Sequence, residues 1–420
     1  MFRRFAHTDA PFPPFFRRFP VAMTTASSSR PRVALIGVTG YAKIYLALAQ
    51  AAHARGEIDL CAAVIINPAE VTTVEAELRA RGCTIYRDYE EMLRVEGGRL
   101  ALCLIPTGIP WHARMTLAAL RAGAHVLVEK PLAGSLAEVA AIRAAEKATG
   151  KFVAVGFQDI YSPVNRWLKE QLCAGVIGPI HTVRFLGLWP RPAAYFTRNP
   201  WAGRLHADGT QVLDSPLNNA FAHFVNLSLY FAGPSRDEAA QVRIESGELL
   251  RAHAIESFDT SVVRARSPEG IAFWFGATHT CREVCEPEIY IEGRAGRVEW
   301  KHERSCIVFK ADGSRDERVL PDTAANRQSM FDAVVGRLSK PDTFVCSTAL
   351  AERHTAFVEA VHASTPVQAV PPELISWQEP VSGTAPVPVV NGLEGALHRA
   401  LASQSLLRDT GFVLQPTRTA

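Results

Sequence analysis

The segment 126–131, VLVEKP in one-letter code, places an acid and an amine directly after a short apolar run. Such a run is typical of a strand buried on both faces of a parallel sheet, so Glu129 and Lys130 stand where the strand ends. Ligands of open α/β sheets bind at this carboxyl end of the strands. A lysine amine there can polarise a carbonyl group or relay a hydroxyl proton, because partial burial lowers its pKa toward neutrality. The segment therefore places Lys130 at the edge of the sheet where a ligand is expected, and a lysine on a surface loop is the other interpretation.

A glycine-containing turn at residues 36–42, IGVTGYA, also follows an apolar run and precedes a helical pattern. In this context a dinucleotide fingerprint needs three small residues at fixed spacing, two glycines followed by a glycine or alanine. Gly37 and Ala42 fit the first and third positions, whereas Thr39 replaces the second glycine and Gly40 stands beside it. A tight turn that needs glycine only for its backbone is the other interpretation. The cofactor-binding residues predicted here are Gly37, Thr39, Gly40, Tyr41 and Ala42.

The second predicted strand ends at Asn67 rather than at the Asp or Glu that would hold the adenosine ribose. No Arg or Lys stands beside Asn67 in the sequence to bind a 2′-phosphate. Asn67 either bonds a ribose hydroxyl or caps a helix that starts at Pro68 and carries Glu70 in its first turn. The sequence thus indicates NAD or NADP and leaves the choice open.

The segment 104–112, LIPTGIPWH, precedes VLVEKP by one predicted helix. From Pro106 to Pro131 the chain resembles the Gfo/Idh/MocA family (glucose–fructose oxidoreductase and inositol dehydrogenase), which has a run similar to TP…H…AL.AG.HVL.EKP. The resemblance continues through 156–158 and 163–178 and covers roughly residues 32–330. It implies a Rossmann domain joined to an α+β domain, and hydride transfer between nicotinamide and a sugar or cyclitol carbon. It also implies that Lys130 lies near the nicotinamide, among the predicted cofactor residues Pro106, Thr107, His112, Glu129 and Lys130.

The family also has a segment similar to D.G.H..D, whose histidine serves as an acid or base. Asp214 matches the first acid, and His223 with Asn226 matches the later pair if five extra residues precede the histidine. Without that insertion, Asn218 occupies the histidine position and the base is missing. The first alignment is favoured, because a neutral imidazole can take an alcohol proton; a packed core histidine is the other interpretation. The predicted catalytic residues are Lys130, His223 and Asp214.

Aromatic and arginine residues gather between Trp189 and Arg204. Aromatic faces stack on the C–H surfaces of sugars, and arginine forks bind carboxylates or hydroxyls. The segment therefore predicts a carbohydrate site, with a solvated arginine-rich loop as the other interpretation. The predicted substrate residues are Gln158, Trp189, Arg191, Tyr195, Arg198, Trp201, Arg204, Asn218 and Asn219.

Short apolar runs alternate with capped helical patterns in the first part of the chain, which predicts βαβ units and a parallel sheet. The predicted strands cover 33–36, 60–66, 83–86, 100–105, 125–128 and 152–156. After about Tyr161 the pattern changes to one helix over 163–174, a mostly β region from 180 to 320, and helices over 219–231, 348–363 and from 391 onwards. Residues 365–390 hold six prolines and predict a long surface loop.

The predicted fold class is α/β, with a Rossmann dinucleotide-binding domain over 31–158 and an α+β domain over 159–420. The second domain is expected to carry a large open, mostly antiparallel sheet, a C-terminal helix, and the substrate and oligomer contacts. Residues 1–30 contain six Phe and are expected to form a disordered extension.

The composition excludes several classes of protein. The net charge of +3 over 420 residues matches the excess of four Arg over one Asp in residues 1–22, so no basic face indicates nucleic acid. No apolar stretch of ~18 residues predicts a membrane span. The eight cysteines show neither a disulfide framework nor a second pair of zinc ligands, so no metal is expected. A cytoplasmic location fits this composition.

Together these patterns predict an NAD(P)-dependent oxidoreductase that acts on CH–OH groups of a sugar, sugar acid or cyclitol. A homodimer or homotetramer is expected, because open sheets in such domains often pair face to face. Two alternatives remain: a glycoside hydrolase or lyase that uses tightly held NAD, and a catalytically silent nucleotide- or sugar-binding protein. Thr39 and Asn67 favour the silent protein, whereas the intact segment around Lys130 opposes it.

Overall fold

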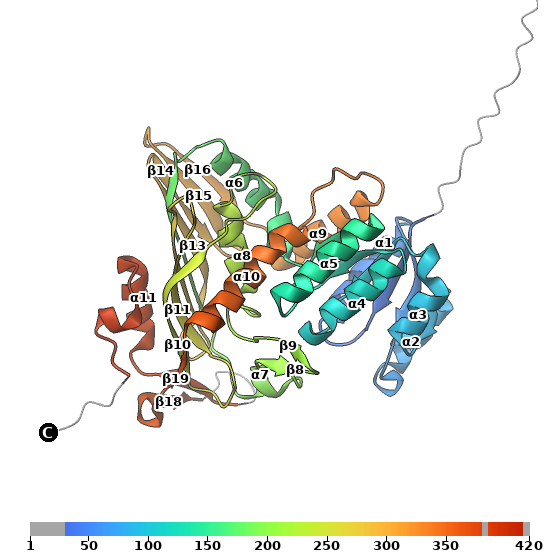
Figure 1. Cartoon of the computed structure of the whole chain (residues 1–420), viewed down its shortest axis with the longest axis horizontal. Coiled ribbons are helices and arrows are strands. Elements are labelled where there is room, and N and C mark those ends of the chain that lie inside the picture. The colour runs from blue at the N-terminus through green and yellow to red at the C-terminus, as the bar shows by residue number, and fades with distance from the viewer. Residues whose placement is uncertain (1–29, 380–384, 415–420) are drawn as a thin grey trace, which may run out of the picture.

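Six parallel strands form the first sheet, in the order β3-β2-β1-β4-β5-β6 (Figure 1). The structure is a computed structural model, and it describes residues 30–379 and 385–414. The expected extension at residues 1–30 therefore lies almost entirely outside the described residues. The strands are β1 (Arg32–Ile36), β2 (Asp59–Val64), β3 (Thr84–Tyr86), β4 (Leu102–Ile105), β5 (His125–Val128) and β6 (Val153–Val155).

Helices connect these strands and cover the sheet, as the alternating pattern predicts. Side chains cap two of these helices: Asp88 accepts from the amide of Glu91, and Ser135 accepts from the amide of Glu138. The helices are α1 (Ala42–Ala54), α2 (Thr72–Ala80), α3 (Tyr89–Glu96), α4 (Ile109–Arg121) and α5 (Leu136–Thr149).

The predicted helix after Asn67 needs correction. Pro68–Glu70 forms only a 3-10 turn, and α2 starts at Thr72 because Val71 has a non-helical backbone. The Asn67 side chain makes no capping hydrogen bond. Asn67 therefore does not act as the predicted N-cap.

The second domain is built on a nine-stranded sheet in the order β16-β15-β14-β13-β7-β12-β11-β10-β17. Its neighbours are antiparallel except for β7 with β12 and β10 with β17, so the predicted large, mostly antiparallel sheet is confirmed. The strands are β7 (Ile180–Leu188), β10 (Arg243–Arg251), β11 (Thr260–Arg266), β12 (Ala272–Thr278), β13 (Cys285–Gly293), β14 (Gly296–Lys301), β15 (Ser305–Lys310), β16 (Arg315–Val319) and β17 (Val367–Ala369).

Helices cover both faces of this sheet unevenly (Figure 1). The helices α8 (Ala222–Phe231) and α10 (Thr348–Ser364) pack on the face toward the first domain, where one continuous core runs through both domains. On the other face α11 (Leu393–Ser403) packs on β7 and β12 through a separate apolar cluster. Strands β13–β16 lie outside that cluster except for Cys285 at the edge of β13.

The described part of the proline-rich region 365–390, which leaves out residues 380–384, holds more secondary structure than predicted. In place of one long loop, β17 pairs with the edge strand β10, and β18 (Ile375–Gln378) pairs with β19 (Val387–Val390). Proline is tolerated at such sheet edges because it costs no ladder hydrogen bond there. The helix expected over 219–231 starts later, at Ala222.

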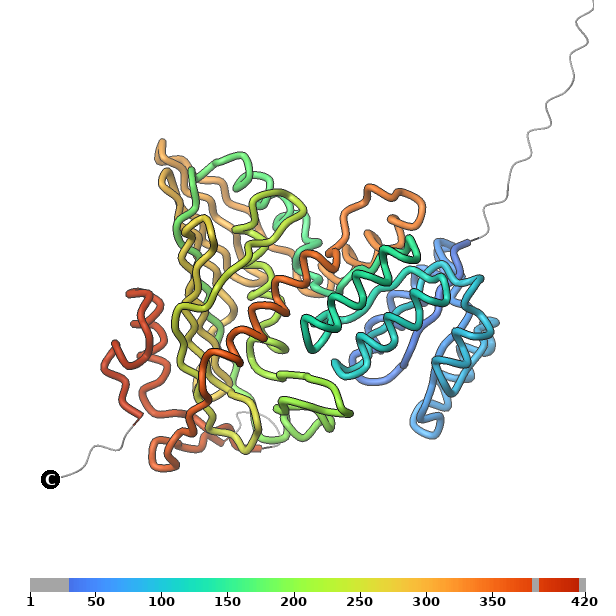
Figure 2. Tube along the Cα trace, viewed as in Figure 1, coloured from blue at the N-terminus to red at the C-terminus, as the bar shows by residue number. Residues whose placement is uncertain are grey.

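The C-terminal part of the chain returns to the first domain (Figure 2). The 3-10 turn η3 (Gln158–Tyr161) leads from β6 into α6 (Pro163–Cys173), and α9 (Thr323–Arg337) packs against η3. The amide of Val155 donates to the carbonyl of Cys346 at 2.9 Å, and α10 packs against both α5 and α8. Residues from α8, α9 and α10 therefore meet at the junction of the domains.

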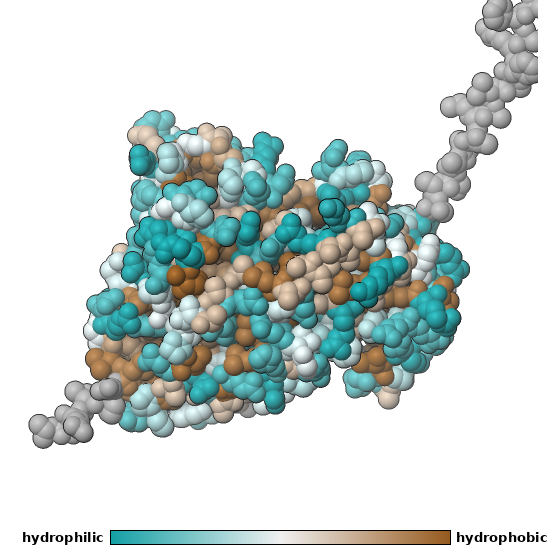
Figure 3. Space-filling model, in the orientation of Figure 1, coloured by the Kyte–Doolittle hydropathy of each residue, from teal (hydrophilic) through white to brown (hydrophobic). Residues whose placement is uncertain are grey.

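The surface and the side-chain clusters add few constraints. On the face in Figure 3, hydrophilic residues cover much of both domains and apolar residues interrupt them. In the described part of the chain, no helix has the length and apolarity of a bilayer span. Among the described residues, no three His, Cys, Asp or Glu side chains are placed to hold a metal ion.

Candidate functional site

Lys130 links the two domains at the carboxyl end of β5. Its half-buried side chain donates from Nζ to the main-chain oxygen of Asn219 at 2.8 Å and to Asn219 Oδ1 at 3.2 Å. The Asn219 amide donates to Asp214 Oδ1 at 2.9 Å, and Asp214 Oδ2 accepts from the amide of Gly203 at 2.6 Å. Burial lowers the pKa of Lys130 and raises the pKa of Asp214. Lys130 and Asp214, both predicted as catalytic, are thus joined through Asn219.

The turn before Asn219 is held in an unusual conformation. Leu213 has φ of 49°, which is costly for a residue with a bulky side chain. The Asn218 amide donates to the main-chain oxygens of Val212 and Leu213 at 2.8 and 3.3 Å. Asn218 therefore fixes the backbone, and its neighbour Asn219 reaches Lys130.

The Glu129 side chain is bonded within the first domain. Its buried carboxylate accepts from Tyr45 Oη at 2.7 Å and from the Lys130 amide at 3.1 Å. A methyl group on Gly156 would come within 2.6 Å of Glu129 Oε1, so β6 also approaches this carboxylate closely. Burial raises the pKa of Glu129. The contacts indicate that Glu129 anchors the Lys130 backbone to α1.

His112 joins the two loops that follow β4 and β5. Its ring nitrogens lie 2.6 Å from the Pro131 oxygen and 3.0 Å from the Thr107 oxygen, and the side chain is buried. Between these loops and the second domain, a methyl group on Gly108 would come within 2.5 Å of Trp201 Nε1. The Trp201 indole therefore lies directly against the backbone that follows β4.

The turn before α1 has the features of an anion site. Gly37 and Gly40 adopt φ of 91° and 56°, and no atom lies within 4 Å of a methyl group placed on Gly40. Among the described residues the amides of Gly40 and Tyr41 have no acceptor, and the first turn of α1 has no acidic residue. A helix N-terminus with free amides favours phosphate. The turn fits a dinucleotide pyrophosphate, with the Thr39 side chain exposed at its rim.

Tyr41 extends this turn toward the domain junction. Its hydroxyl donates to Gln158 Oε1 at 3.3 Å, and the Arg327 guanidinium carbon lies 5.4 Å from the centre of its ring. Burial raises the pKa of Tyr41, whereas Arg327 lowers it. The predicted residues Tyr41 and Gln158 thus come together beneath a cation from α9 that the sequence analysis did not identify.

The expected absence of a basic residue near the end of the second strand holds only along the sequence. In space, Arg87 donates to the Ile65 oxygen at 3.2 Å, because β3 pairs with β2 in parallel. Arg87 also donates to Glu75 at 2.7 Å. The exposed Asn67 follows two residues after Ile65.

His223 lies on α8 and faces Asp159 rather than Asn219. Its Nδ1 atom is 3.4 Å from Asp159 Oδ2, and Asn326 donates to Asp159 Oδ1 at 3.1 Å. Burial, followed by the charge of Lys130, holds the pKa of His223 well below its usual range. His223 and Lys130 are therefore brought near each other without a direct hydrogen bond.

The predicted substrate segment forms the other wall of the junction. The Arg198 guanidinium lies 3.7 Å from the centre of the Tyr195 ring and 5.7 Å from that of Trp201, and the guanidinium of Arg191 lies 4.9 Å from Tyr195. Trp189 stacks on Phe221 and donates to Glu286 at 3.0 Å. This arrangement places aromatic faces and arginines side by side.

A cavity of about 650 Å³ lies behind this segment, between residues 193–204 and 253–256. Arg204 lines it and forms an exposed ion pair with Glu256 at 3.5 Å. Lys130 is not among the lining residues. Arg204 thus lines this cavity. Arg198 instead lies near Trp201, the residue that reaches Gly108.

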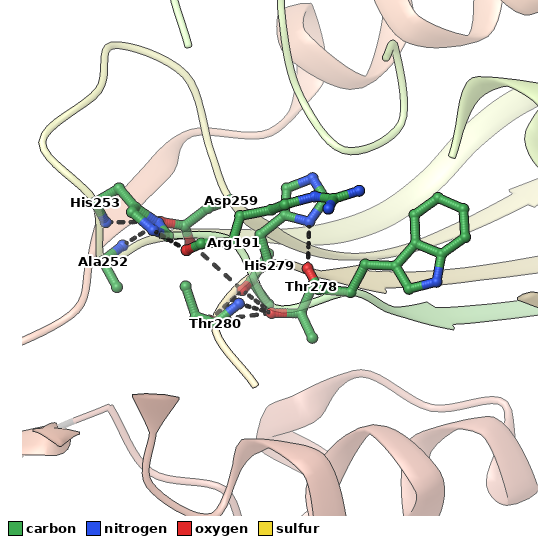
Figure 4. A network of polar contacts seen from close by, with 9 residues as sticks. Arg191, Ala252, His253, Asp259, Thr278, His279 and Thr280 are labelled. Atoms are coloured by element: carbon green, nitrogen blue, oxygen red, sulfur yellow. Dashed lines mark hydrogen bonds and ion pairs between the residues drawn. The ribbon is translucent and has the colours of Figure 1, made fainter. Parts of the chain in front are cut away.

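A buried polar network that includes His253, Asp259 and His279 holds the backbone around Arg191 (Figure 4). His253 Nδ1 is 2.8 Å from Asp259 Oδ2, and its Nε2 is 2.9 Å from the Arg191 oxygen. His279 Nδ1 lies 2.8 Å from the Trp189 oxygen. Both histidines thereby hold the backbone that carries the predicted substrate residues.

Sequence reasoning missed the residues that other segments bring to the site. Asp159 stands next to Gln158 in the sequence, but nothing in its spacing indicates a histidine partner 64 positions away. Asn326 and Arg327 reach the site only because α9 packs on η3. Tyr45 lies on α1, four residues after Tyr41. In a helix this spacing places two side chains on the same face, so Tyr45 could have been predicted to lie near Tyr41.

Comparison with known proteins identifies the first domain. A family model described as "Oxidoreductase family, NAD-binding Rossmann fold" (Gfo/Idh/MocA) matches residues 31–157. The predicted family resemblance is therefore confirmed.

The curated relatives are distant, and the share of the chain that they match varies. A dTDP-3,4-didehydro-2,6-dideoxy-α-D-glucose 3-reductase from Streptomyces violaceoruber is 29% identical over 161 residues, which are 38% of this chain and 46% of the relative. A D-apiose dehydrogenase from Paraburkholderia graminis is 24% identical over 326 residues, 75% of this chain and 79% of the relative. The first match thus spans less than half of the curated relative.

Solved structures share the two-domain fold. Levoglucosan dehydrogenase in complex with NADH has a TM-score of 0.67 and 19% identity, covering 80% of this chain and 96% of that one. The WlbA dehydrogenase from Bordetella pertussis, in complex with NADH and UDP-GlcNAcA, has a TM-score of 0.63 and 20% identity over 80% and 96%. At such identities the likeness establishes the fold.

The Tyr45–Glu129 contact predicts a pH-dependent loss of stability. In Tyr45→Phe the buried carboxylate loses a donor, so we expect the free energy of unfolding to fall by about 1–3 kcal/mol at pH 8. The pKa of Glu129 is raised in the folded state of the wild type. Its contribution to the free energy of unfolding therefore decreases as pH rises through that pKa. Losing Tyr45 raises the pKa further, and the deficit should therefore be smaller at pH 5 than at pH 8.

Chemical denaturation of both proteins across this pH range measures the difference. Tyr89→Phe is the matched control, because Tyr89 donates to the exposed Glu90 at 3.1 Å; its effect should stay within about 0.5 kcal/mol. A Tyr45→Phe deficit that is independent of pH would contradict the assignment.

Proposed function

Because residues 31–157 match the model of the Gfo/Idh/MocA oxidoreductase family, we propose that this chain transfers a hydride between a nicotinamide dinucleotide and a carbon that bears a hydroxyl group in a sugar, sugar acid or cyclitol. The single observation that carries the proposal is the Lys130 amine, which stands at the carboxyl end of β5 and is held by Asn219 of the second domain. The names of relatives that act on inositol, apiose and a deoxysugar nucleotide support this substrate class.

The residues present fit the cofactor. The free amides at Gly40 and Tyr41 would hold the pyrophosphate, and the loops of Thr107 and Lys130 would flank the nicotinamide. When bound, this group supplies the hydride acceptor. Arg87 lies at the end of β2, where it would have to exchange its contact with Glu75 for a phosphate on the ribose. The choice between NAD and NADP stays open.

Residues of this chain handle the hydroxyl proton of the substrate. Asn219 takes hydrogen bonds from Lys130 Nζ through two of its oxygens. An ammonium group has three donors, so it retains capacity for a substrate oxygen. Burial lowers the pKa of Lys130, whereas Glu129 and then Asp214 raise it, and Asn219 lies between Lys130 and Asp214. Lys130 is thus suited to orient a hydroxyl group and to stabilise the oxygen as its proton leaves.

Substrate recognition falls to the segment that carries Tyr195, Arg198 and Trp201. Its aromatic faces suit the C–H surfaces of a sugar ring, and its guanidinium suits hydroxyl or carboxylate oxygens. The contact of Trp201 with Gly108 brings this segment to the loop that follows β4, on the side of the predicted nicotinamide site.

We further propose a homodimer or homotetramer that works in the cytoplasm. The observation in favour is the part of the large sheet formed by β13–β16, which the α11 cluster leaves largely uncovered. Side chains such as Tyr290, Ile307 and Phe309 are only half-buried there, as contact residues of an interface would be.

Cofactor binding is the first test. We expect NADH, NADPH or both to quench or enhance protein fluorescence saturably below millimolar concentration. Gly40→Val should weaken this binding at least about tenfold, because its side chain would enter the open space at the turn. Gly82→Val is the matched control, since Gly82 has φ of 84°, similarly open surroundings and a position far from the turn.

If neither nucleotide binds at millimolar concentration, hydride transfer is contradicted and the silent binding protein becomes the better interpretation. Equal loss in Gly40→Val and Gly82→Val would assign the effect to backbone strain.

Substrate recognition is the second test. With a panel of myo-inositol, D-apiose and levoglucosan, Arg198→Ala should weaken substrate binding by about tenfold or more, the value of one hydrogen bond to a charged group. Arg204→Ala should have the same direction if the whole segment binds substrate. Nucleotide affinity should stay nearly unchanged in both variants, because the segment lies on the second domain.

Initial rates and nucleotide titration measure the two effects separately. Arg236→Ala is the control, because Arg236 is exposed and, within the described part of the chain, forms one ion pair, with Glu170 at 3.4 Å. A parallel loss of substrate and nucleotide binding would mean that the segment is structural or contacts the cofactor.

A further inference from the structure

A buried His–Asp pair lies where the first domain passes into the second. Asp159 belongs to η3, directly after β6, and His223 belongs to the first turn of α8. Their side chains are 3% and 10% exposed, and Asp159 Oδ2 lies 3.4 Å from His223 Nδ1. The pair is therefore formed by two segments that are distant in the sequence.

Each of the two facing atoms lacks another partner. Among the described residues, Asp159 Oδ2 and His223 Nδ1 are both buried and neither makes a hydrogen bond. The large majority of buried polar side-chain atoms in proteins are paired. A small closure of the 3.4 Å gap would pair both at once, with Nδ1–H as the donor and the carboxylate as the acceptor.

Asp159 is fixed in place independently of the histidine. Its Oδ1 atom accepts from Asn326 on α9 at 3.1 Å, and its main-chain oxygen accepts from Asn165 at 2.8 Å. Asn165 in turn accepts from Trp300 Nε1 at 2.8 Å. The carboxylate is therefore held rigidly, as a group must be if it is to orient a neighbour.

The charges around the pair favour a neutral imidazole. Lys130 from the end of β5 and Arg327 from α9 both lower the pKa of His223, after burial, as do His302 after β14 and His354 on α10. Arg327 and His302 also lower the pKa of Asp159 against the effect of burial, and Glu303 raises it. The arrangement thus opposes a proton on both ring nitrogens at neutral pH.

We propose that Asp159 is the positioning residue for His223: it fixes the ring proton on Nδ1 and leaves the Nε2 lone pair to take the hydroxyl proton of the substrate. This inference rests on the proposed function. In the step, the O–H bond breaks as the N–H bond forms at Nε2, while the carbon loses its hydride to the nicotinamide dinucleotide and becomes a carbonyl. The imidazolium then releases the proton to solvent.

A second His–Asp pair in the chain shows what distinguishes this one. His253 faces Asp259 at 2.8 Å in a similar way, but its Nε2 atom already lies 2.9 Å from the Arg191 oxygen. Nε2 of His253 is therefore occupied by the backbone, whereas no such contact holds Nε2 of His223 among the described residues. The exposed tenth of the His223 side chain comes from atoms other than the buried Nδ1.

Nitrogen NMR of the full-length chain with labelled histidine tests the tautomer directly. We expect His223, assigned by its loss in His223→Gln, to carry its proton on Nδ1 at pH 7.5. Asp159→Asn and Asp159→Ala should shift the population toward Nε2–H and leave His253 unchanged. Asp259→Asn is the matched control and should alter His253 alone. A wild-type His223 with its proton on Nε2, or one insensitive to Asp159, would overturn the proposal.

Kinetics with the best substrate among myo-inositol, D-apiose and levoglucosan test the catalytic role of the His223–Asp159 pair. Because general base catalysis is typically worth ~10²–10⁴, His223→Gln should reduce kcat by about a hundredfold or more. Asp159→Asn should reduce kcat in the same direction, and the double variant should lose little more than His223→Gln, since the two residues act as a unit. The wild-type rate of alcohol oxidation should fall as His223 becomes protonated at low pH, and this limb should vanish in His223→Gln.

Nucleotide titration of the same variants separates this inference from the proposed function. Unchanged nucleotide affinity with unchanged kcat would overturn the His–Asp proposal and leave hydride transfer intact. Absence of nucleotide binding in the wild type would instead contradict the proposed function, and the NMR result would still decide whether the pair exists.

Discussion

A single ammonium group holds the candidate site together across the domain junction. Lys130 comes from the end of a strand whose position is set by the parallel sheet, and its Nζ atom is bound by two oxygens of Asn219 from the other domain. That contact fixes the turn in which Asn219 also bonds Asp214, and Asp214 receives the amide of Gly203 behind it. The relative position of the residues that the two domains bring to the candidate site thus depends on this bridge.

The fold supports the bridge from both directions. On the first domain, Glu129 is buried against Tyr45 and Gly156, so the backbone of Lys130 has little freedom to move. On the second, α9 and α10 return from the large sheet and pack against η3, α5 and α8. This return brings Asn326 and Arg327 to the same junction as Asp159 and His223. The polar groups at the site therefore come from segments that only the complete chain brings together.

Features that depend on neighbouring residues could be predicted from the sequence. Contacts between segments that are far apart in the chain could not. The position of Lys130 was predictable because an apolar run followed by charges marks a strand end within six residues. Asn219 contacts Lys130, whereas Asn218 bonds the backbone of Val212 and of Leu213, whose positive φ no residue type indicated. Arg87 approaches the end of β2 only because β3 is its neighbour in the sheet. Asp159 and His223 meet because α8 packs beside η3, which spacing along the chain does not encode.

The central claim is that Lys130, held by Asn219, stands beside the nicotinamide of a dinucleotide bound at the glycine turn. A crystal structure of the chain with bound NADH or NADPH tests it most directly. We predict the pyrophosphate on the amides of Gly40 and Tyr41, and the nicotinamide ring between Lys130 and the loop of Thr107, with Lys130 Nζ still bonded to Asn219. A dinucleotide bound elsewhere, or a nicotinamide ring that lies away from Lys130, would contradict the account.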